Sequence, residues 1–185
     1  MPAFDRITLP TRRLLLRPLQ EADAPALLAV FSDPKVMRYW STPPWDSMEA
    51  AHAMIARDRK AMAAGDHIRL GLERIEDQAL LGVCTLFAFS QQCRRAEVGY
   101  CLASQAWGRG YMDEALRALL GHGFVELGLN RVEADIDPRN AASARSLERL
   151  GFKKEGHLRE RWIVGDEVSD TALYGLLKSE WVPGQ

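Results

Sequence analysis

The middle of the chain, from residue 96 to residue 137, constrains the fold most strongly because it predicts two short strands joined by one long helix. Residues 96–102 (AEVGYCL) are typical of a strand, and residues 130–137 (NRVEADID) alternate as a half-buried strand does. Residues 111–127 place apolar side chains along one face of a helix. A helix of this length between two short strands predicts a right-handed parallel crossover, and ligands of such sheets bind at the carboxyl ends of the strands.

The rest of the chain predicts further strands and helices on both sides of this crossover. Strands are expected over residues 13–19, 67–73, 79–87, 158–164 and 168–177, and helices over residues 21–31, 46–64 and 141–150. Asp46 and Glu49 have the spacing of a capping box that opens the second of these helices. Gly165-Asp166 is a two-residue hairpin signal. This order predicts an α/β (α+β) fold, a mixed sheet with helices on its faces.

Composition and charge indicate one ordinary globular domain over residues 1–185. The chain is 47% hydrophobic and 26% charged, and no repeat, low-complexity tract or flexible linker divides it. Its 24 Lys and Arg against 25 Asp and Glu give a net charge of -1, so no global field favours nucleic acid or a membrane as a partner. It has no apolar run of the length of a membrane span or signal peptide, so we expect a cytoplasmic protein.

The cysteines and histidines indicate neither a disulfide framework nor a metal site. Cys84, Cys93 and Cys101 are odd in number and form no CxxC pair, which is typical of reduced thiols. The four histidines have no metal-ligand spacing. We therefore expect no bound metal.

Residues 105–112 (QAWGRGYM) connect the first strand of the crossover to its helix and carry the clearest chemical signal. Gly108 and Gly110 bracket one residue, so the backbone can turn tightly and a ligand can approach the main chain closely. The free N–H groups of the following helix would point outward, with the positive end of the helix dipole behind them. This arrangement predicts a phosphate cradle, to which Arg109 can add a positive charge.

The common nucleotide-binding loops do not match this segment. No GK[ST] follows the glycines, and the GxGxxG spacing with an acidic ribose ligand is absent, so ATP and NAD are disfavoured. The structural alternative is that the glycines only shape a tight turn and that Arg109 is solvated.

Three patterns in order make the chain similar to a known family. QxxGxG follows AEVGYxL, NxxSxxxxExLGF spans residues 140–152, and EGxxR spans residues 155–159. Together they resemble the GNAT superfamily of acetyl-CoA-dependent N-acetyltransferases, and within it the ribosomal-protein N-terminal acetyltransferase branch. The resemblance runs from about residue 13 to residue 181. It implies a mostly antiparallel twisted sheet around the crossover, acetyl-CoA as the acetyl donor and an amine as the acceptor.

The resemblance also implies which residues would hold coenzyme A. The residues expected at the diphosphate are those of the glycine loop and the helix start, Gln105, Gly108, Arg109, Gly110, Tyr111 and Met112. Cys101 and Leu102 would hydrogen-bond the pantetheine arm like an added strand, which requires this strand to splay from its neighbour. Asn140 matches a side-chain contact to the cofactor, and its alternative role is a helix N-cap.

The implied reaction is direct attack of an amine on the thioester without a covalent enzyme intermediate. Glu155 and Ser143 match positions proposed in the ribosomal branch for water-mediated deprotonation and thiolate protonation, and Glu97 matches a base used in other branches. The structural alternatives are a surface position for Glu97, a salt bridge from Glu155 to Lys153, Lys154 or Arg159, and a first-turn position for Ser143. Cys101 is expected to line the core or the cofactor, since it has no obvious His and Asp partners.

The acceptor is the least constrained part of the prediction. An α-amine has a reference pKa near 7.7–8.0, against about 10.4 for lysine, so a distant base would suffice for it. Without one unmistakable catalytic carboxylate, we expect an α-amine, such as a protein N-terminus. The alternatives are a small amine such as an aminoglycoside or polyamine, or a non-catalytic acyl-CoA-binding module. Tyr39, Trp40 and Trp45 either border the acceptor site or cap the core. A homodimer is an open expectation, because dimers are common among similar proteins.

Overall fold

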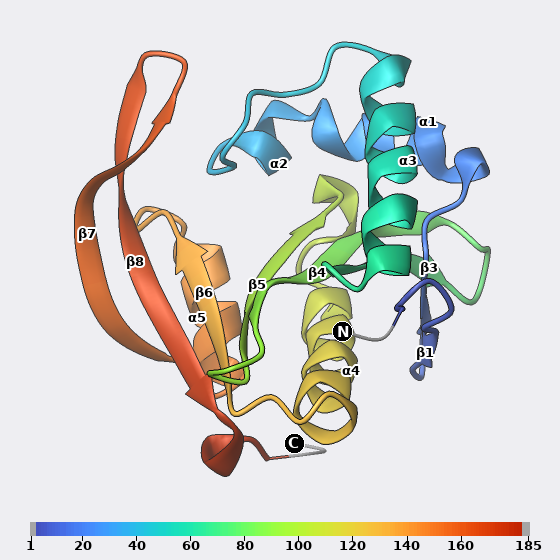
Figure 1. Ribbon diagram of the computed structural model, residues 1–185. Coiled ribbons are helices and arrows are strands. Elements are labelled where there is room, and N and C mark those ends of the chain that lie inside the picture. The colour runs from blue at the N-terminus through green and yellow to red at the C-terminus, as the bar shows by residue number, and fades with distance from the viewer. Residues whose placement is uncertain (1–2, 183–185) are drawn as a thin grey trace.

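A computed structural model describes residues 3–182 of the chain, and within them the strands form a single eight-stranded sheet (Figure 1). The spatial order is β1-β2-β3-β4-β5-β6-β8-β7. The strands are β1 (Leu9–Pro10), β2 (Leu14–Arg17), β3 (Ile68–Arg74), β4 (Leu80–Ser90), β5 (Arg95–Leu102), β6 (Arg131–Ile136), β7 (Lys153–Val164) and β8 (Glu167–Leu177). Across this described part, β5 and β6 form the one parallel pair and every other pair is antiparallel. The predicted mixed, mostly antiparallel sheet is confirmed.

Helices cover both faces of the sheet. They are η1 (Glu21–Asp23), α1 (Ala24–Phe31), α2 (Pro34–Met37), α3 (Met48–Ala64), η2 (Ser104–Ala106), α4 (Tyr111–Gly121), η3 (His122–Glu126), α5 (Ala141–Arg149) and η4 (Lys178–Glu180). One core contains Cys84 with α4, and a second core contains the neighbouring Val83 with α1 and most of the buried residues of α3. Since successive strand residues face opposite sides, these helices pack on opposite faces. No helix within residues 3–182 has the length and apolar character needed to cross a membrane.

Two helix boundaries differ from the sequence prediction. The long α3 begins after Ser47 rather than at a capping box of Asp46 and Glu49, and Ser47 itself makes no capping hydrogen bond with its side chain. The helix predicted over residues 111–127 is α-helical only to Gly121 and continues as a π-helical turn, η3. A Cβ at Gly123 in that turn would lie 3.2–3.3 Å from Leu129 and Leu86, so a glycine lets the turn pack closely against the sheet.

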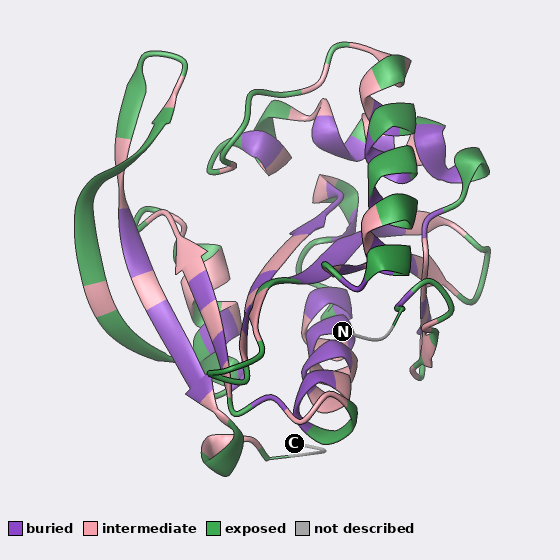
Figure 2. Ribbon diagram, viewed as in Figure 1, coloured by how far each residue is buried: buried purple, intermediate pink, exposed green. Residues whose placement is uncertain are grey.

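The hairpin at the C-terminal end has the predicted two-residue turn. Val164 pairs with Glu167 across Gly165-Asp166, and Gly165 has a positive φ of 59°. Strand β7 begins at Lys153, five residues before the predicted strand, so Glu155 lies within it. Figure 2 shows β7 as an exposed edge strand, while β8 is buried along much of its length.

Gly82 in β4 tests how closely β4 and β5 must approach. A Cβ at Gly82 would lie 2.2 Å from the Cys101 carbonyl oxygen and 2.9 Å from the Leu102 Cα. Because backbone atoms cannot move aside locally, Gly82→Ala should lower the free energy of unfolding by about 1–3 kcal/mol, measured by urea denaturation.

Gly121→Ala is the matched control. An added Cβ there meets no described atom within 4 Å, so the substitution should raise the free energy of unfolding by about 0.5–1 kcal/mol. Equal effects of the two substitutions would contradict the close approach of β4 to β5.

Candidate active site

The two parallel strands of the crossover separate soon after they meet. Only three residue pairs join them, ending at Glu97 and Glu133. Beyond this point β5 keeps its antiparallel partner β4 as far as Leu102, while β6 stays paired with β8. The edge of β5 that faces β6 is therefore left without a strand partner over residues 98–102. The splaying of this strand from its neighbour, which the sequence predicts, is therefore present.

A cleft of about 2210 Å³ opens where the strands separate. Most of the predicted site residues line it, and these are Glu97, Cys101, Leu102, Gly108, Gly110, Tyr111, Met112, Asn140 and Ser143. Gln105, Arg109 and Glu155 are not among its lining residues. The fold thus gathers residues from β5, the glycine loop and α5 around one cavity.

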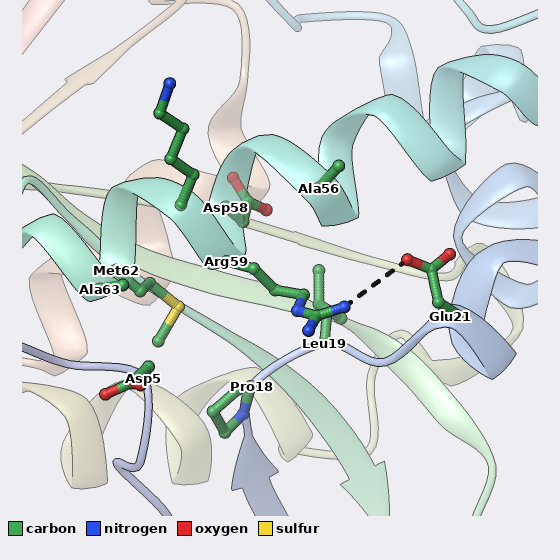
Figure 3. A pocket seen from close by; sticks show the side chains of 10 residues that line it. Asp5, Pro18, Leu19, Glu21, Ala56, Asp58, Arg59, Met62 and Ala63 are labelled. Atoms are coloured by element: carbon green, nitrogen blue, oxygen red, sulfur yellow. Dashed lines mark ion pairs between the residues drawn. The ribbon is translucent and has the colours of Figure 1, made fainter.

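A smaller pocket of about 570 Å³ lies beside α3 and contains none of the predicted site residues. Figure 3 shows it between α3 and the segment that follows β2, with Arg59 and Glu21 paired at 3.8 Å. Its buried carboxylate, Asp58, is held by Arg69 at 2.9 Å. The large cleft is therefore the candidate active site.

The glycine loop presents free backbone donors to the cleft. Gly108 and Gly110 have φ values of 74° and 76°, a left-handed conformation that glycine adopts without strain. Within residues 3–182, no acceptor receives a hydrogen bond from the N–H groups of residues 108–112. Helix α4 starts directly after Gly110, so the positive end of its dipole lies behind these donors. The loop and helix start have the chemistry of a phosphate site.

Arg13 contacts this loop from a distant part of the sequence, and sequence reasoning missed it. Its guanidinium donates a hydrogen bond to the Arg109 carbonyl oxygen at 2.8 Å. It also pairs with Glu114 at 2.7 Å and lies 4.6 Å from the centre of the Tyr111 ring. No local motif signals this contact, because it joins the residue before β2 to a loop 96 residues later.

Ser143 is held by two neighbours in the cleft. The Tyr100 Oη and the Ser143 Oγ lie 2.7 Å apart, and the Ser143 backbone N–H donates to Asn140 Oδ1 at 3.1 Å. Asn140 is therefore the N-cap of α5, as its structural alternative predicted, and it also lines the cleft. Burial raises the pKa of Tyr100 to about 12, so its phenol stays protonated at neutral pH. It can donate to Ser143 and leave the serine hydroxyl proton free to point into the cleft.

Glu97 and Glu155 have opposite environments. Glu97 stands where β5 and β6 separate, and within the described chain its side chain forms no hydrogen bond or ion pair. Burial raises its pKa, and the nearby charges of Glu133 and Asp135 raise it further. Glu155 is exposed and pairs through both oxygens with Arg131, which lowers its pKa. The structure thus places Glu97 in the cleft and Glu155 in a salt bridge outside it.

The aromatic residues after α1 contact both the core and the cleft. The ring of Trp45 stacks on Phe31 at 4.4 Å, and Trp40 meets Phe31 edge-on at 5.8 Å. Tyr39, Trp40 and Trp45 also line the cleft, so their contact with the core does not remove them from it. The segment between α2 and α3 that carries these residues lies across from the β7–β8 hairpin (Figure 1), and residues of both line the cleft.

Ion pairs connect that segment to the hairpin. Glu167 of β8 accepts from Arg38 at 3.1 Å and from Arg139 at 2.7 Å. Arg139 in turn pairs with Asp137 at 2.5 Å. The carboxylates at this end of the cleft are therefore largely neutralised by arginines.

Solved structures share this architecture. A GNAT-family acetyltransferase from Bacillus anthracis is 25% identical, with a TM-score of 0.84, covering 94% of this chain and 100% of that one. Two structures below 25% identity show the fold alone. RimJ of Mycobacterium smegmatis in complex with CoA-disulfide is 24% identical with a TM-score of 0.87, covering 97% of this chain and 91% of that one. Spermidine N-acetyltransferase of Vibrio cholerae in complex with CoA and spermine is 23% identical with a TM-score of 0.80, covering 91% of this chain and 97% of that one.

The family follows from the sequence match. The acetyltransferase (GNAT) domain model matches residues 13–153, and the chain belongs to this family. The uncharacterized N-acetyltransferases p20 of Bacillus licheniformis and YoaA of Bacillus subtilis are 35% and 36% identical, covering 94% and 92% of this chain and 98% and 96% of theirs. The ribosomal protein uS5-alanine N-acetyltransferase of Escherichia coli is 25% identical, covering 97% of this chain and 95% of its own.

The cysteines differ in burial, and chemical modification can therefore test the role of Cys101. Burial raises the pKa of the Cys101 thiol to about 12, and Cys84 is buried too, whereas Cys93 is exposed. Since only thiolates react, iodoacetamide at pH 8 should modify each native chain once, at Cys93, as read by peptide mass spectrometry. Rapid modification of Cys101 would reveal an activated thiol and reopen covalent catalysis.

Proposed function

We propose that the protein transfers an acetyl group from acetyl-CoA to a primary amine by direct attack within a ternary complex. The observation that carries this proposal is the set of N–H groups at residues 108–112 that have no acceptor within residues 3–182, in a loop that lines a cleft between splayed strands. An anionic diphosphate fits such donors, and an amide-bearing arm fits the open edge of β5. The family match supports the same donor.

The main chain would hold the donor in two segments. The N–H groups of Gly108 and Gly110–Met112 would bind the diphosphate, while the Leu102 N–H, which faces away from β4, would hydrogen-bond the pantetheine arm. The Ala103 N–H donates to the Leu81 carbonyl oxygen, so by the alternation of an antiparallel pair the main chain of Cys101 also faces β4. Cys101 lines the cleft but does not offer the predicted main-chain contact. Both segments line the same cleft, and β5 leads directly from one to the other through η2. This path directs the thioester toward Glu97, Tyr100 and Ser143.

Two groups in the cleft can handle the protons of the reaction. Glu97, through water, accepts the proton that the amine releases as its nitrogen bonds to the acyl carbon. Ser143, with its hydroxyl oriented by Tyr100, donates a hydrogen bond to the sulfur as the carbon–sulfur bond breaks. Glu155 is less suited to the base role, because it does not line the cleft and because its hydrogen bonds with Arg131 lower its pKa.

We infer that the acceptor is an α-amine, most simply a protein N-terminus. A polyamine site would present unpaired carboxylates to several positive charges, but here Asp137 and Glu167 are paired with Arg38 and Arg139. Of the carboxylates that line the cleft, Glu97 and Asp46 have no ion pair within the described residues. Glu97 lies where the two strands separate, and a single carboxylate at that point suits a single amine. The relative whose name gives ribosomal protein uS5 as its substrate supports this choice, although it is 25% identical.

A panel of acceptors tests the proposal. Peptides with free or blocked N-termini, free lysine side chains, polyamines and aminoglycosides are each incubated with acetyl-CoA, and thiol release is followed. Release with free N-terminal peptides alone is expected. Preference for polyamines or lysine side chains would overturn the acceptor assignment, and tight CoA binding without turnover on any amine would favour a regulatory acyl-CoA module.

Substitution of each glutamate by glutamine distinguishes Glu97 from Glu155 as the base. Glu97→Gln should lower kcat on the order of 10²-fold, because the carboxylate that accepts the proton is lost. In the wild type, the rate should rise with pH through the raised pKa of Glu97, since only the ionised form is a base. That limb of the pH–rate profile should vanish in Glu97→Gln.

Glu155→Gln is the matched control for this prediction. It changes an exposed carboxylate in the Arg131 pair, so kcat and the pH–rate profile should stay close to those of the wild type. A larger loss with Glu155→Gln than with Glu97→Gln would assign the base to Glu155 instead.

A further inference from the structure

We propose that Arg13 is the positioning residue of the glycine loop, setting the peptide plane that aims the Gly110 N–H at the diphosphate of CoA. This inference rests on the proposed function, since it takes CoA as the ligand. It concerns a residue outside the glycine loop and the cleft lining.

The peptide bond between Arg109 and Gly110 is oriented by Arg13. The Arg13 Nη1 donates to the Arg109 carbonyl oxygen at 2.8 Å, so this oxygen is held on the Arg13 side of the loop. The described chain contains no cis peptide bond, and in a trans peptide the C=O and the following N–H point in opposite directions. The Gly110 N–H therefore points away from Arg13. Gly110 lines the cleft and Arg13 does not, so that direction is toward the ligand site.

Arg13 is itself held by Glu114 and Tyr111, and Thr11 in turn holds Glu114. Glu114, in the first turn of α4, accepts from the Arg13 Nε and from the Arg13 backbone N–H, both at 2.7 Å. Thr11 donates its hydroxyl to the same carboxylate at 2.6 Å. The guanidinium also stacks over the Tyr111 ring, 4.6 Å from its centre. A side chain held this firmly can impose one orientation on the loop.

The role of Arg13 is geometric more than electrostatic. Glu114 lies 2.7 Å from the guanidinium and balances its charge. The planar guanidinium can donate to a carboxylate and a carbonyl oxygen at once, which a lysine cannot do with the same geometry. A glycine at position 110 also fits this arrangement, because a Cβ there would lie 3.4 Å from the Arg13 Nη2 on a backbone with positive φ.

The test compares CoA with S-acetylpantetheine, which lacks the 3′-phospho-ADP half of CoA and with it the diphosphate. Arg13→Met keeps the aliphatic stem over Tyr111 but removes the hydrogen bonds. Its Kd for CoA should rise roughly 10- to 100-fold, the range for a hydrogen bond to a charged group. Its Kd for S-acetylpantetheine, which lacks the diphosphate, should be unchanged. Calorimetry measures the first value, and NMR titration measures the second.

Two further variants make the result specific. Arg12→Met removes the same charge from the neighbouring residue, which is exposed and has no hydrogen bond or ion pair within the described residues, so its Kd for CoA should match the wild type. Arg13→Lys keeps the positive charge but cannot donate to the Glu114 carboxylate and the Arg109 carbonyl oxygen with the same geometry, so it should also lose CoA affinity. This variant serves as the test if Arg13→Met does not fold.

Failure of the Arg13 role can be distinguished from failure of the proposed function. Equal CoA affinity in the Arg13 variants and Arg12→Met would overturn the positioning role. An equal loss for both ligands would also overturn it, because it would show a general structural defect. Failure of the wild-type protein to bind CoA would overturn the proposed function, and this inference with it.

Discussion

The early separation of β5 from β6 is the constraint on which the rest of the site depends. Three parallel pairs, ending at Glu97 and Glu133, join the strands before each follows its other neighbour. An unpaired strand edge inside a protein must find hydrogen-bond partners in water or a ligand. The cleft, the open edge of β5 and the position of Glu97 all follow from this separation.

The glycine loop completes the site because it lies at the same end of β5. Its donors are main-chain N–H groups at the start of α4, so the protein can attract a diphosphate locally while its net charge is only -1. The carboxylates that line the cleft differ in whether they form ion pairs. Arginines pair with Asp137 and Glu167, whereas Glu97, at the point where β5 and β6 separate, has no ion pair among the described residues.

Local patterns were sufficient to predict the crossover, the glycine loop and the C-terminal hairpin. The left-handed Gly108 and Gly110 and the turn at Gly165-Asp166 are features that a few adjacent residues determine. The start of α3 was placed wrongly, since two residues with capping-box spacing do not decide where the chain enters a helix.

Contacts between distant segments could not be predicted in this way. Arg13 reaches the glycine loop, Tyr100 meets Ser143, and Arg131 rather than a neighbouring lysine or Arg159 pairs with Glu155. Each of these contacts depends on which strands and helices become neighbours in the folded sheet. Most of the segments that line the cleft could therefore be predicted from the sequence. Only the tertiary structure shows that the two candidate bases, Glu97 and Glu155, have different surroundings.

The most direct test of the central claim is the NMR response of the backbone amides when ¹⁵N-labelled protein is titrated with CoA and, separately, with pantetheine. The account predicts large shifts of the Gly108, Gly110, Tyr111 and Met112 amide signals with CoA and small ones with pantetheine. If CoA bound while these four signals stayed in place, the glycine loop would not be the diphosphate site.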